Sequence, residues 1–430
     1  MRVLVVGGGG REHALCWAWK RDAPADDLFT APGNPGTAAL GTNLKIAATA
    51  VDELVAAVAQ HDIDLTIVGP EAPLAAGLAD RLRAARRAVF GPSRAAARLE
   101  SSKAYAKEVM RRAGVPTAAS RTFTDLTPAL DYIRTHAEPL VVKASGLAAG
   151  KGAVVCDTRA EAAATARAML ADGALGDAGR EIVVEDFLEG EELSVLALTD
   201  GERLVILPPA QDHKRLGEGD SGPNTGGMGA YCPVSLATPK LLARVRRDVL
   251  EPVLHEMAAQ GAPYEGVLYA GLMLARDGTP YVLEFNCRFG DPEAQVILPG
   301  LAPGVSQHVH DIAAGNWRPA TDLLAPARAA TTTVLAARGY PEDPEKGVAI
   351  NLPAPDQLGR DVLVFHAGTY RDPDGRLRTA GGRVLSVTGL GATVPEAARV
   401  SAAACERIAF EGKTWRRDIA WREIRRAGAA

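Results

Sequence analysis

Apolar and polar positions in the first hundred residues follow two alternating patterns. Short β-branched runs (RVLVVG, DLTIVG, AVFG) end in glycine, and segments with helical spacing separate them (EHALCWAWKR, VDELVAAVAQH, GLADRLRAARR). Strands that alternate with helices of this length predict βαβ units and a doubly wound parallel sheet. The ligand crevice of such a sheet lies beyond the carboxyl ends of its strands. Here those ends are the Gly- and Pro-rich segments 7–10, 31–36, 69–73 and 91–93, all of which we predict to be loops.

The pattern changes after residue 100. SSKAYAKEVMRRAG predicts a helix that ends at a glycine, and PLVVKAS and GAVVCDT predict two strands joined by GLAAGK. EIVVEDFLEGEELSVLALTDG predicts two more strands around an acidic turn, and residues 241–260 predict a long amphipathic helix. GVLYAGLMLARDGTPYVLEFN reads as a hairpin whose turn is Asp277-Gly278. Beyond about residue 320, short strands and Gly-rich turns precede a closing helix.

Residues 211–231, QDHKRLGEGDSGPNTGGMGAY, show neither the alternation typical of a strand nor the spacing typical of a helix. The stretch contains six glycines and hardly any apolar side chain before Met228. On composition alone it is either a linker between domains or a binding loop.

Composition limits the class of protein. At 430 residues the chain exceeds one hydrophobic core, and about three domains are expected. A net charge of -4 and a pI near 6.1 give no global attraction to nucleic acid or acidic lipid. The five cysteines are far apart, and no apolar run is long enough to cross a bilayer. We therefore expect a soluble, cytoplasmic protein with no nucleic-acid or membrane partner.

Two glycine-rich segments are candidates for anion binding. GGGGREH follows the first strand but fails the dinucleotide fingerprint, because Glu12 occupies the third glycine position. It is either a tight turn or a backbone anion site. SGLAAGKG (145–152) is not a P-loop, because three residues separate Gly146 from Gly150 and glycine follows Lys151. It is either a plain hairpin loop or a flap that closes over phosphates, with Lys143 pointing at the same phosphates.

VLEFNCRFGDPE (282–293) carries the most specific chemistry. Side chains two apart on a strand share a face, so Glu284 and Asn286 are expected side by side. Such an oxygen pair suits Mg²⁺ with phosphates and water as further ligands. Arg288 would clamp a carboxylate. The alternative is an ordinary polar surface strand.

The acids Glu185, Glu191 and Glu192 surround a predicted strand end. They could bind an adenine amino group or ribose hydroxyls, but the segment by itself favours an acidic, solvated turn. The histidines show no catalytic spacing, and His213 is expected to be structural or a neighbour of substrate.

These segments, in this order, resemble the ATP-grasp superfamily and, within it, the glycinamide ribonucleotide synthetase (phosphoribosylamine–glycine ligase) family. The segments that carry the resemblance are DHKRLGEGDSGPNTGGMGAYCP, EFNCRFGDPE, GREHAL, APGNPG and GPEAPL, with GYPEDPEKGVAI, VFHAGT, GGRVLSVTG and RRDIAWR toward the C-terminus. The likeness covers essentially the whole chain. It implies an α/β N-terminal domain (1–100), an ATP-grasp lid and hinge (101–190) and catalytic region (191–325) built from two antiparallel sheets, and a small β-rich C-terminal domain (326–430).

The resemblance also implies a role for each matching residue. The lid segment 145–152 would close over ATP, and the ATP-binding residues would be Lys103, Lys143, Ser145, Gly146, Gly150, Lys151, Gly152, Glu185, Phe187, Leu188 and Glu191. Glu284 and Asn286 would hold Mg²⁺ or Mn²⁺. Arg288 would be catalytic and would clamp the glycine carboxylate. Asp212 and Lys214 are expected to be catalytic from their position alone, because they could present charge to glycine and to the transferred phosphoryl group. 5-Phosphoribosylamine would lie against Gly9, Asn34, Gly36 and Glu71. Asn224 and Gly226 are also expected to bind substrate, and which substrate each contacts is left open.

The implied reaction activates glycine as an acyl phosphate at the expense of ATP, and the amine of phosphoribosylamine then attacks it. This chemistry requires positioning and charge neutralisation more than acid–base catalysis. The enzyme is expected to act in purine biosynthesis as a monomer. The alternatives are a sibling ATP-grasp ligase with another substrate, a nicotinamide oxidoreductase, and a non-catalytic nucleotide-binding module.

Overall fold

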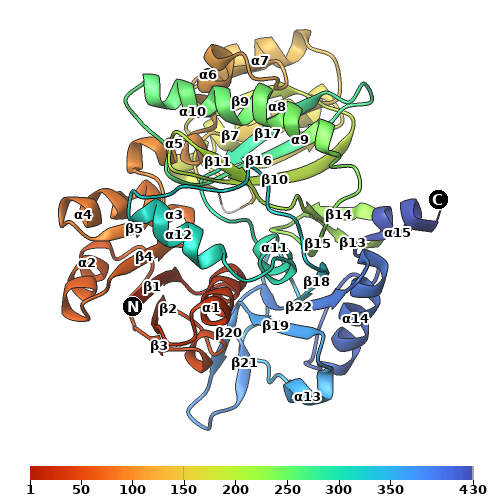
Figure 1. The fold of residues 1–430 in the computed structure, drawn as a ribbon. Coiled ribbons are helices and arrows are strands. Elements are labelled where there is room, and N and C mark those ends of the chain that lie inside the picture. Colours follow the sequence, from red (N-terminus) through yellow and green to blue (C-terminus); the bar gives the residue numbers. More distant parts are fainter. Residues whose placement is uncertain (149, 429–430) are drawn as a thin grey trace.

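The N-terminal part of the chain forms the predicted parallel sheet (Figure 1). The computed structural model describes residues 1–148 and 150–428. The strands lie in the order β3-β2-β1-β4-β5, with the bounds Thr42–Asn43, Asp27–Pro32, Arg2–Gly7, Leu65–Val68 and Ala88–Phe90. Strand β1 pairs in parallel with both β2 and β4, so the order reverses at β1. A crevice at the carboxyl end of β1 follows from this topology.

Helices return the chain between these strands: α1 (Gly10–Asp22), α2 (Val51–Gln60), α3 (Glu71–Ala75) and α4 (Leu78–Ala84). The prediction that 69–73 is a loop was wrong, because α3 begins at Glu71. Pro73 misled the prediction. It lies in the first turn of α3, where a missing N–H breaks no helical hydrogen bond.

Two helices then lead to the core of the molecule. Helix α5 (Arg94–Ser101) is followed by Ser102, whose side chain caps α6 (Lys103–Ala113) by accepting from the Tyr105 backbone N–H at 3.2 Å. Helix α6 therefore begins two residues after the start predicted from the sequence. It ends as expected before Gly114, which has a φ of 66°.

Two antiparallel sheets form the upper half of Figure 1. The first has the order β6-β9-β7-β8, with the bounds Ser120–Phe123, Ile182–Asp186, Leu140–Ala144 and Ala153–Cys156, and it packs against α7 (Leu126–Thr135) and α8 (Arg159–Leu170). The second has the order β11-β10-β16-β17, with the bounds Leu204–Ile206, Glu191–Thr199, Gly266–Leu274 and Pro280–Asn286. The predicted hairpin is confirmed: β16 pairs antiparallel with β17, and Gly278 has a φ of 77° in the turn.

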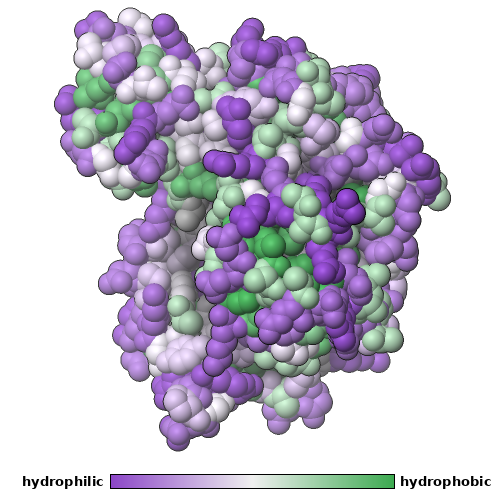
Figure 2. Space-filling model, turned by 90° about the vertical axis from the view of Figure 1, so that its left-hand side faces the viewer, coloured by the Kyte–Doolittle hydropathy of each residue, from purple (hydrophilic) through white to green (hydrophobic). Residues whose placement is uncertain are grey.

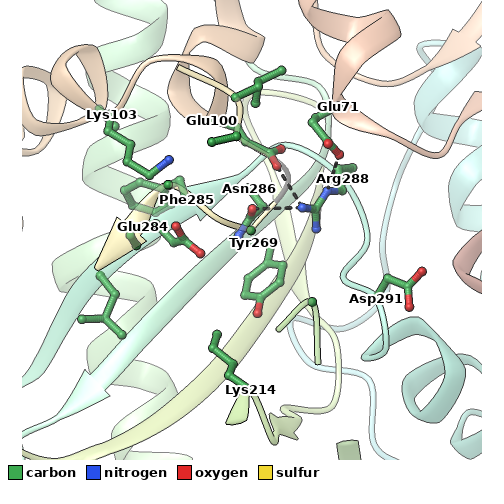
Figure 3. A pocket seen from close by; sticks show the side chains of 18 of the residues that line it. Glu71, Glu100, Lys103, Lys214, Tyr269, Glu284, Phe285, Asn286, Arg288 and Asp291 are labelled. Carbon is green, nitrogen blue, oxygen red and sulfur yellow. Dashed lines mark hydrogen bonds and ion pairs between the residues drawn. The ribbon is translucent and has the colours of Figure 1, made fainter. Parts of the chain in front are cut away.

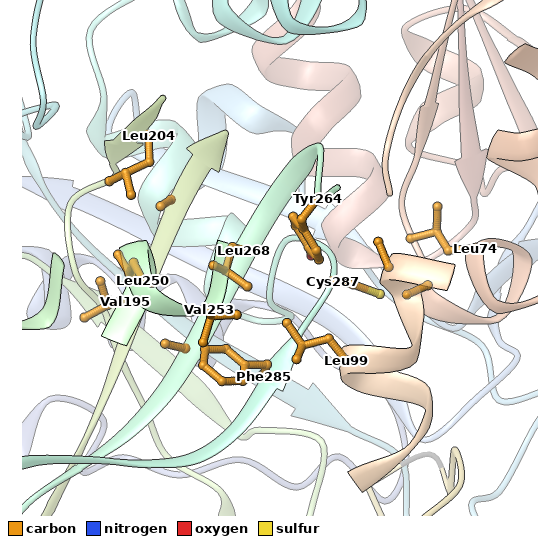
Figure 4. Close-up of a cluster of buried hydrophobic side chains, with 14 of the residues drawn as sticks. Leu74, Leu99, Val195, Leu204, Leu250, Val253, Tyr264, Leu268, Phe285 and Cys287 are labelled. Atoms are coloured by element: carbon orange, nitrogen blue, oxygen red, sulfur yellow. The ribbon is translucent and has the colours of Figure 1, made fainter. Parts of the chain in front are cut away.

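The predicted long helix over 241–260 is interrupted. It consists of α9 (Pro239–Val245), a π-helical turn (Arg246–Leu250) and α10 (Glu251–Ala259). Pro252 accounts for the interruption, because its ring and missing N–H disturb the regular hydrogen-bond ladder of the preceding turn. Leu250 and Val253 still reach the buried cluster that contains Leu268 and Phe285 (Figure 4).

Residues 211–231 are more regular than their sequence indicates. They contain β12 (Gln211–Asp212), β13 (Arg215–Gly217), a 3₁₀ turn (Glu218–Asp220), β14 (Ser221–Asn224) and most of β15 (Gly229–Cys232). Expecting no strand here was wrong. These strands are two to four residues long, and β15 is held by pairing with β18, about a hundred residues later, which no local pattern reveals.

The C-terminal part completes a sheet of order β12-β15-β18-β22-β19. Its later strands are β18 (Ala329–Ala336), β19 (Val362–His366) and β22 (Arg383–Gly391), with the hairpin β20 (Thr369–Arg371) and β21 (Leu377–Thr379) beside them. The remaining helices are η1 (Thr37–Ala39), η2 (Gly176–Gly179), α11 (Ala294–Gly300), α12 (Val305–Ala313), α13 (Pro355–Leu358), α14 (Val394–Arg407) and α15 (Trp421–Gly428).

The surface is hollowed beneath its upper lobe (Figure 2). The two antiparallel sheets occupy that upper part, and the N- and C-terminal sheets lie below (Figure 1). None of the helices among residues 1–148 and 150–428 is long and apolar enough to span a bilayer.

The cluster in Figure 4 gives a prediction about stability. Leu268 is fully buried in it. We expect Leu268→Ala to lower the free energy of unfolding by about 2–5 kcal/mol, because it removes buried surface and leaves a cavity. Urea unfolding followed by tryptophan fluorescence measures this change. Leu323→Ala, the same substitution at a side chain that is 39% exposed, is the control. Equal losses for the two variants would contradict the assignment of this core.

Candidate active site

A cavity of about 410 Å³ is lined by residues of both antiparallel sheets and of the N- and C-terminal parts. Its wall takes side chains from segments far apart in the sequence (Figure 3). The predicted site residues that line it are Glu71, Lys103, Gly150, Gly152, Glu185, Asp212, Lys214, Asn224, Gly226, Glu284, Asn286 and Arg288. The structure thus brings together the predicted ATP, metal, catalytic and amino-terminal segments.

Two lysines share one buried glutamate, Glu185, which lines the cavity. Lys143 on β7 lies 3.0 Å from Glu185 Oε2, and Lys107 on α6 lies 3.2 Å from Glu185 Oε1. Lys143 also donates to the Leu283 carbonyl at 2.9 Å. Burial lowers the pKa of Lys107, and Lys143 lowers it further, while Glu185 opposes both. The pairing fixes both ammonium groups. Lys107 lines the cavity, whereas Lys143, which was predicted to bind ATP, lies outside the lining.

Glu284 and Asn286 both reach the cavity from β17, as their spacing predicted. Burial by itself would raise the pKa of Glu284, but the ammonium groups of Lys103 and Lys143 outweigh it and the pKa is lowered. The carboxylate is therefore ionised. An ionised carboxylate beside an amide oxygen is a donor set that fits Mg²⁺. No group of three or more His, Cys, Asp or Glu side chains within the described chain is arranged to hold a metal ion, so phosphate or water oxygens would complete the shell.

Arg288 is held by acids from two other segments (Figure 3). Its Nη2 lies 2.9 Å from Glu100 Oε1 on α5, and its Nε donates to Glu71 Oε2 at 3.2 Å. Nη2 also donates to Asn286 Oδ1 at 3.2 Å. Burial opposes the charge of Arg288, yet Glu100 and Glu71 raise its pKa above the ordinary value. The guanidinium is thus fixed, and only Nη1, which donates to the Phe289 carbonyl, keeps a second N–H free to point elsewhere.

Asp212 and Lys214 form a second charged group. Lys214 Nζ lies 3.0 Å from Asp212 Oδ1 and also pairs with Glu192. Burial raises the pKa of Asp212; Lys214 opposes the rise, and Glu293 adds to it. Glu293 in turn accepts hydrogen bonds from the Tyr269 hydroxyl at 2.6 Å and the Ser194 hydroxyl at 3.1 Å. This end of the cavity therefore presents an ammonium group flanked by carboxylates.

Some residues of segment 145–152 line the cavity. Gly150 and Gly152 line it, whereas Ser145, Gly146 and Lys151 lie outside the lining. The Ser145 hydroxyl accepts from the Ala104 backbone N–H at 3.1 Å, and the Gly146 N–H donates to the Ala178 carbonyl at 3.1 Å, so both anchor the base of the segment. Ala149 belongs to the predicted lid but lies outside the described residues.

The other predicted contacts lie away from the cavity wall. Phe187 and Leu188 follow β9 outside the lining, and Glu191 pairs with Arg426 of α15. Asn34 hydrogen-bonds the carbonyls of Gly8 at 3.0 Å and His366 at 2.8 Å, while its Oδ1 accepts from the Gly36 N–H at 2.8 Å. Asn34 thus ties the N-terminal loops to the C-terminal part. Substrate contacts of Gly9, Asn34 and Gly36 stay predictions.

Sequence reasoning missed several residues that line the cavity: Arg11, Glu100, Lys107, Tyr269, Asp291, Glu293 and Arg383. Asp291 and Glu293 lay in the quoted GDPE segment, which was the available signal. Glu100 and Lys107 sit on helices where charged residues are ordinary, so nothing local marked them. His213 proved structural: its Nε2 accepts from the Ala420 backbone N–H at 3.0 Å.

Family comparisons agree with this geometry. Models described as the N, ATP-grasp (A) and C domains of phosphoribosylglycinamide synthetase match residues 1–100, 101–294 and 330–422. The chain is 47% identical over 430 residues to the phosphoribosylamine–glycine ligase of Yersinia pestis, covering 99% of this chain and 100% of that protein. It is 48% identical over 428 residues to the phosphoribosylamine–glycine ligase of Ralstonia nicotianae, with coverage of 99% and 100%.

Solved structures agree as well. The crystal structure of phosphoribosylamine–glycine ligase from Thermotoga maritima superposes with a TM-score of 0.86 at 38% identity, covering 98% of this chain and 100% of that one. Biotin carboxylase from Campylobacter jejuni gives a TM-score of 0.72 at 15% identity, covering 96% and 92%, which shows the shared fold alone. The predicted fold class, a parallel N-terminal sheet joined to an ATP-grasp core and a β-rich C-terminal part, is confirmed. The chain belongs to the phosphoribosylglycinamide synthetase family.

Proposed function

We propose that the cavity joins glycine to 5-phosphoribosylamine through a glycyl phosphate, with the residues named below in specific roles. The chain is an ATP-dependent carboxylate–amine ligase of purine biosynthesis. One observation supports the assignment of roles: three groups of charged and polar side chains line a single cavity. They are the Glu284 carboxylate with the Asn286 amide on β17, the lysines at one end, and Arg288 with the Asp212–Lys214 pair at the other. These are the groups needed to hold a nucleotide, a metal ion and a small carboxylate.

ATP would occupy the end of the cavity near Lys103 and Lys143. Lys103 begins α6, and its N–H donates to the Ser145 carbonyl at 2.8 Å, so the helix and the lid segment share one anchor. Glu185, Phe187, Leu188 and Glu191 would hold adenine and ribose. Lid residues 145–152 would cover the phosphates and keep water from the acyl phosphate.

Glu284 and Asn286 would hold the divalent ion, for which we propose Mg²⁺ or Mn²⁺. Such an ion neutralises phosphate charge when it is bound. The ammonium groups of Lys103 and Lys143, which already lower the pKa of Glu284, would neutralise the rest of the phosphate charge.

Glycine would lie between Arg288 and the Asp212–Lys214 pair. The free N–H of Arg288 Nη1 would donate to the glycine carboxylate, while the Asp212 carboxylate would accept from the glycine ammonium group. A glycine carboxylate oxygen then attacks the γ-phosphorus of ATP, and ADP leaves with the electron pair of the broken P–O bond. Lys214 would face the transferred phosphoryl group.

Phosphoribosylamine would approach from the N-terminal rim, past Gly9, Asn34, Gly36 and Glu71, with Asn224 and Gly226 opposite. Its amine attacks the acyl carbon, the C–O bond breaks with its electron pair on the departing phosphate, and that phosphate takes up the proton that the amine nitrogen loses. Glu71 lines the cavity and accepts from Arg288 Nε, which supports our proposal that it contacts the amine.

The domain division 1–100, 101–190, 191–325 and 326–430 is likewise a proposal. Each antiparallel sheet of the upper half falls within one of the two middle ranges, which supports it, whereas β12 and β15 join the C-terminal sheet. We further propose that the protein is a monomer. A cytoplasmic location agrees with the free, buried state of all five cysteines.

An ADP-release assay tests the function. Freshly made phosphoribosylamine, glycine and Mg²⁺–ATP are combined, and each substrate is omitted in turn. We expect ADP release to require glycine and glycinamide ribonucleotide to form only with all three. ADP release that is indifferent to glycine would refute the proposal, and replacement of glycine by another small carboxylate without loss of rate would favour a sibling ligase.

Arg288→Ala is expected to raise the KM for glycine about 10- to 100-fold, because a hydrogen bond to a charged group contributes roughly 1.5–3 kcal/mol. The KM for ATP should change little. Initial rates at varied glycine measure this effect. Arg276→Ala, an exposed arginine paired with Glu189 at 3.1 Å, is the control. An unchanged glycine KM would place the carboxylate clamp elsewhere.

The raised pKa of Asp212 predicts a pH effect. An acid with a raised pKa stays protonated to higher pH, so the carboxylate that accepts from glycine forms only above that pKa. We expect kcat/KM for glycine to fall on the acid side, with an apparent pKa above the ordinary aspartate value of about 4. Asp212→Asn should lower kcat/KM and remove that acid limb. Asp277→Asn, in the exposed hairpin turn, should keep it. An acid limb that survives in Asp212→Asn would refute the role.

A further inference from the structure

The C-terminal segment packs against the outer side of the 211–224 segment. Arg416, the residue at the centre of this contact, is 1% exposed. It donates to Asp220 Oδ1 at 2.9 Å and to the Arg215 carbonyl at 3.1 Å, and it forms a two-pronged contact with Asp418 at 2.8 Å through Nε and 2.8 Å through Nη2. One buried guanidinium therefore joins both segments.

Asp220 receives a second arginine from the same segment. Arg422 Nη2 lies 2.6 Å from Asp220 Oδ2. Backbone contacts run alongside: the Gly219 N–H donates to Asp418 Oδ2 at 2.9 Å, and the Arg417 N–H donates to Glu218 Oε1 at 3.1 Å. Residues 416–422 thus hold residues 218–220, the turn between β13 and β14, through several hydrogen bonds.

The hairpin has little else to hold it. Strands β13 and β14 form a two-stranded sheet with a register irregularity between Arg215 and Gly217, and β14 is exposed. Isolated two-stranded hairpins are marginal in water. Contacts outside the hairpin must therefore fix it, and residues 416–422 supply them.

The backbone carries this restraint to the cavity. Asp212, His213 and Lys214 are consecutive in extended chain, so their side chains alternate between two faces. Asp212 and Lys214 line the cavity. His213 points to the other side, where its Nε2 accepts from the Ala420 N–H at 3.0 Å and its Nδ1 lies 3.7 Å from Asp220 Oδ1.

The far end of the hairpin also returns to the cavity. The Thr225 N–H and hydroxyl both contact the Lys214 carbonyl, at 2.7 Å and 2.8 Å. Asn224, Thr225 and Gly226 line the wall there. A shift of the hairpin would accordingly move both of its ends, which are cavity-lining segments.

We propose that residues 416–422 position Asp212 and Lys214 for the reaction from outside the cavity, with Arg416, Asp220 and His213 as the positioning residues. The inference rests on the proposed function for the roles of Asp212 and Lys214. It assigns to the C-terminal segment a part in glycine activation, although none of its residues lines the cavity described here.

The test uses Asp220→Asn, Arg416→Met and the double variant, with Arg417→Met as the matched control. Arg417 is the neighbouring arginine, and its side chain is 63% exposed. We expect Asp220→Asn and Arg416→Met each to lower kcat/KM for glycine about 10- to 100-fold, as small misplacements of catalytic groups do. The KM for ATP should stay within about twofold, and the double variant should lose less than the product of the single losses.

Arg416→Lys keeps a cation beside Asp220 and is expected to restore part of the lost glycine activity. Hydrogen exchange of the 213–224 amides in the enzyme without substrate should be faster in Asp220→Asn than in wild type. Asp220 is only partly buried, so this variant remains informative if Arg416→Met fails to fold.

Three outcomes would overturn the inference. They are unchanged glycine kinetics in Asp220→Asn, a rise in the KM for ATP equal to the loss for glycine, or unchanged amide exchange over 213–224. A wild-type enzyme that released ADP without glycine would instead refute the proposed function. The exchange measurement would still test the positioning role in that case.

Discussion

Pairing of buried charges is the constraint on which the active cavity depends. Lysines from α6 and β7 share Glu185, and Arg288 lies between Glu71 and Glu100. A buried charge that loses its partner costs several kcal/mol, so each cation is fixed where an acid from another segment meets it. The positions of the functional groups therefore follow from contacts between segments. No single strand or helix sets them.

The same pairing joins the parts of the molecule. Arg288 at the end of β17 contacts Glu71 of the N-terminal α3, and Arg383 of the C-terminal β22 lies 3.2 Å from Asp291 Oδ1. Asn34 adds a neutral link between the first loops and His366. The N- and C-terminal parts thus contribute to one cavity wall. A change in any of these contacts would therefore move side chains that line the cavity.

This arrangement explains which features the sequence could predict. Alternating strands and helices identified the parallel sheet, and the period of two on β17 placed Glu284 and Asn286 on one face. Local spacing carries that information. Glu100 and Lys107 were missed because their role comes from partners far along the chain, and the strands in 211–231 were missed because they depend on β18. The family resemblance named candidate residues that lie in long motifs, but it carried no information on the acids, Glu71 and Glu100, that hold Arg288.

The internal partners also bear on how the enzyme meets its anionic substrates. Lys143, Lys107 and Arg288 are held by carboxylates, so their orientation is set before any phosphate or carboxylate arrives, which limits the reorganisation that the reaction requires. The same carboxylates reduce the positive potential that an incoming anion meets. Lys103 differs, because no ion pair to it occurs in the described part of the chain, and it faces Glu284 across the cavity. A phosphate group would therefore be attracted chiefly by Lys103, while the paired cations, already in place, would determine its orientation.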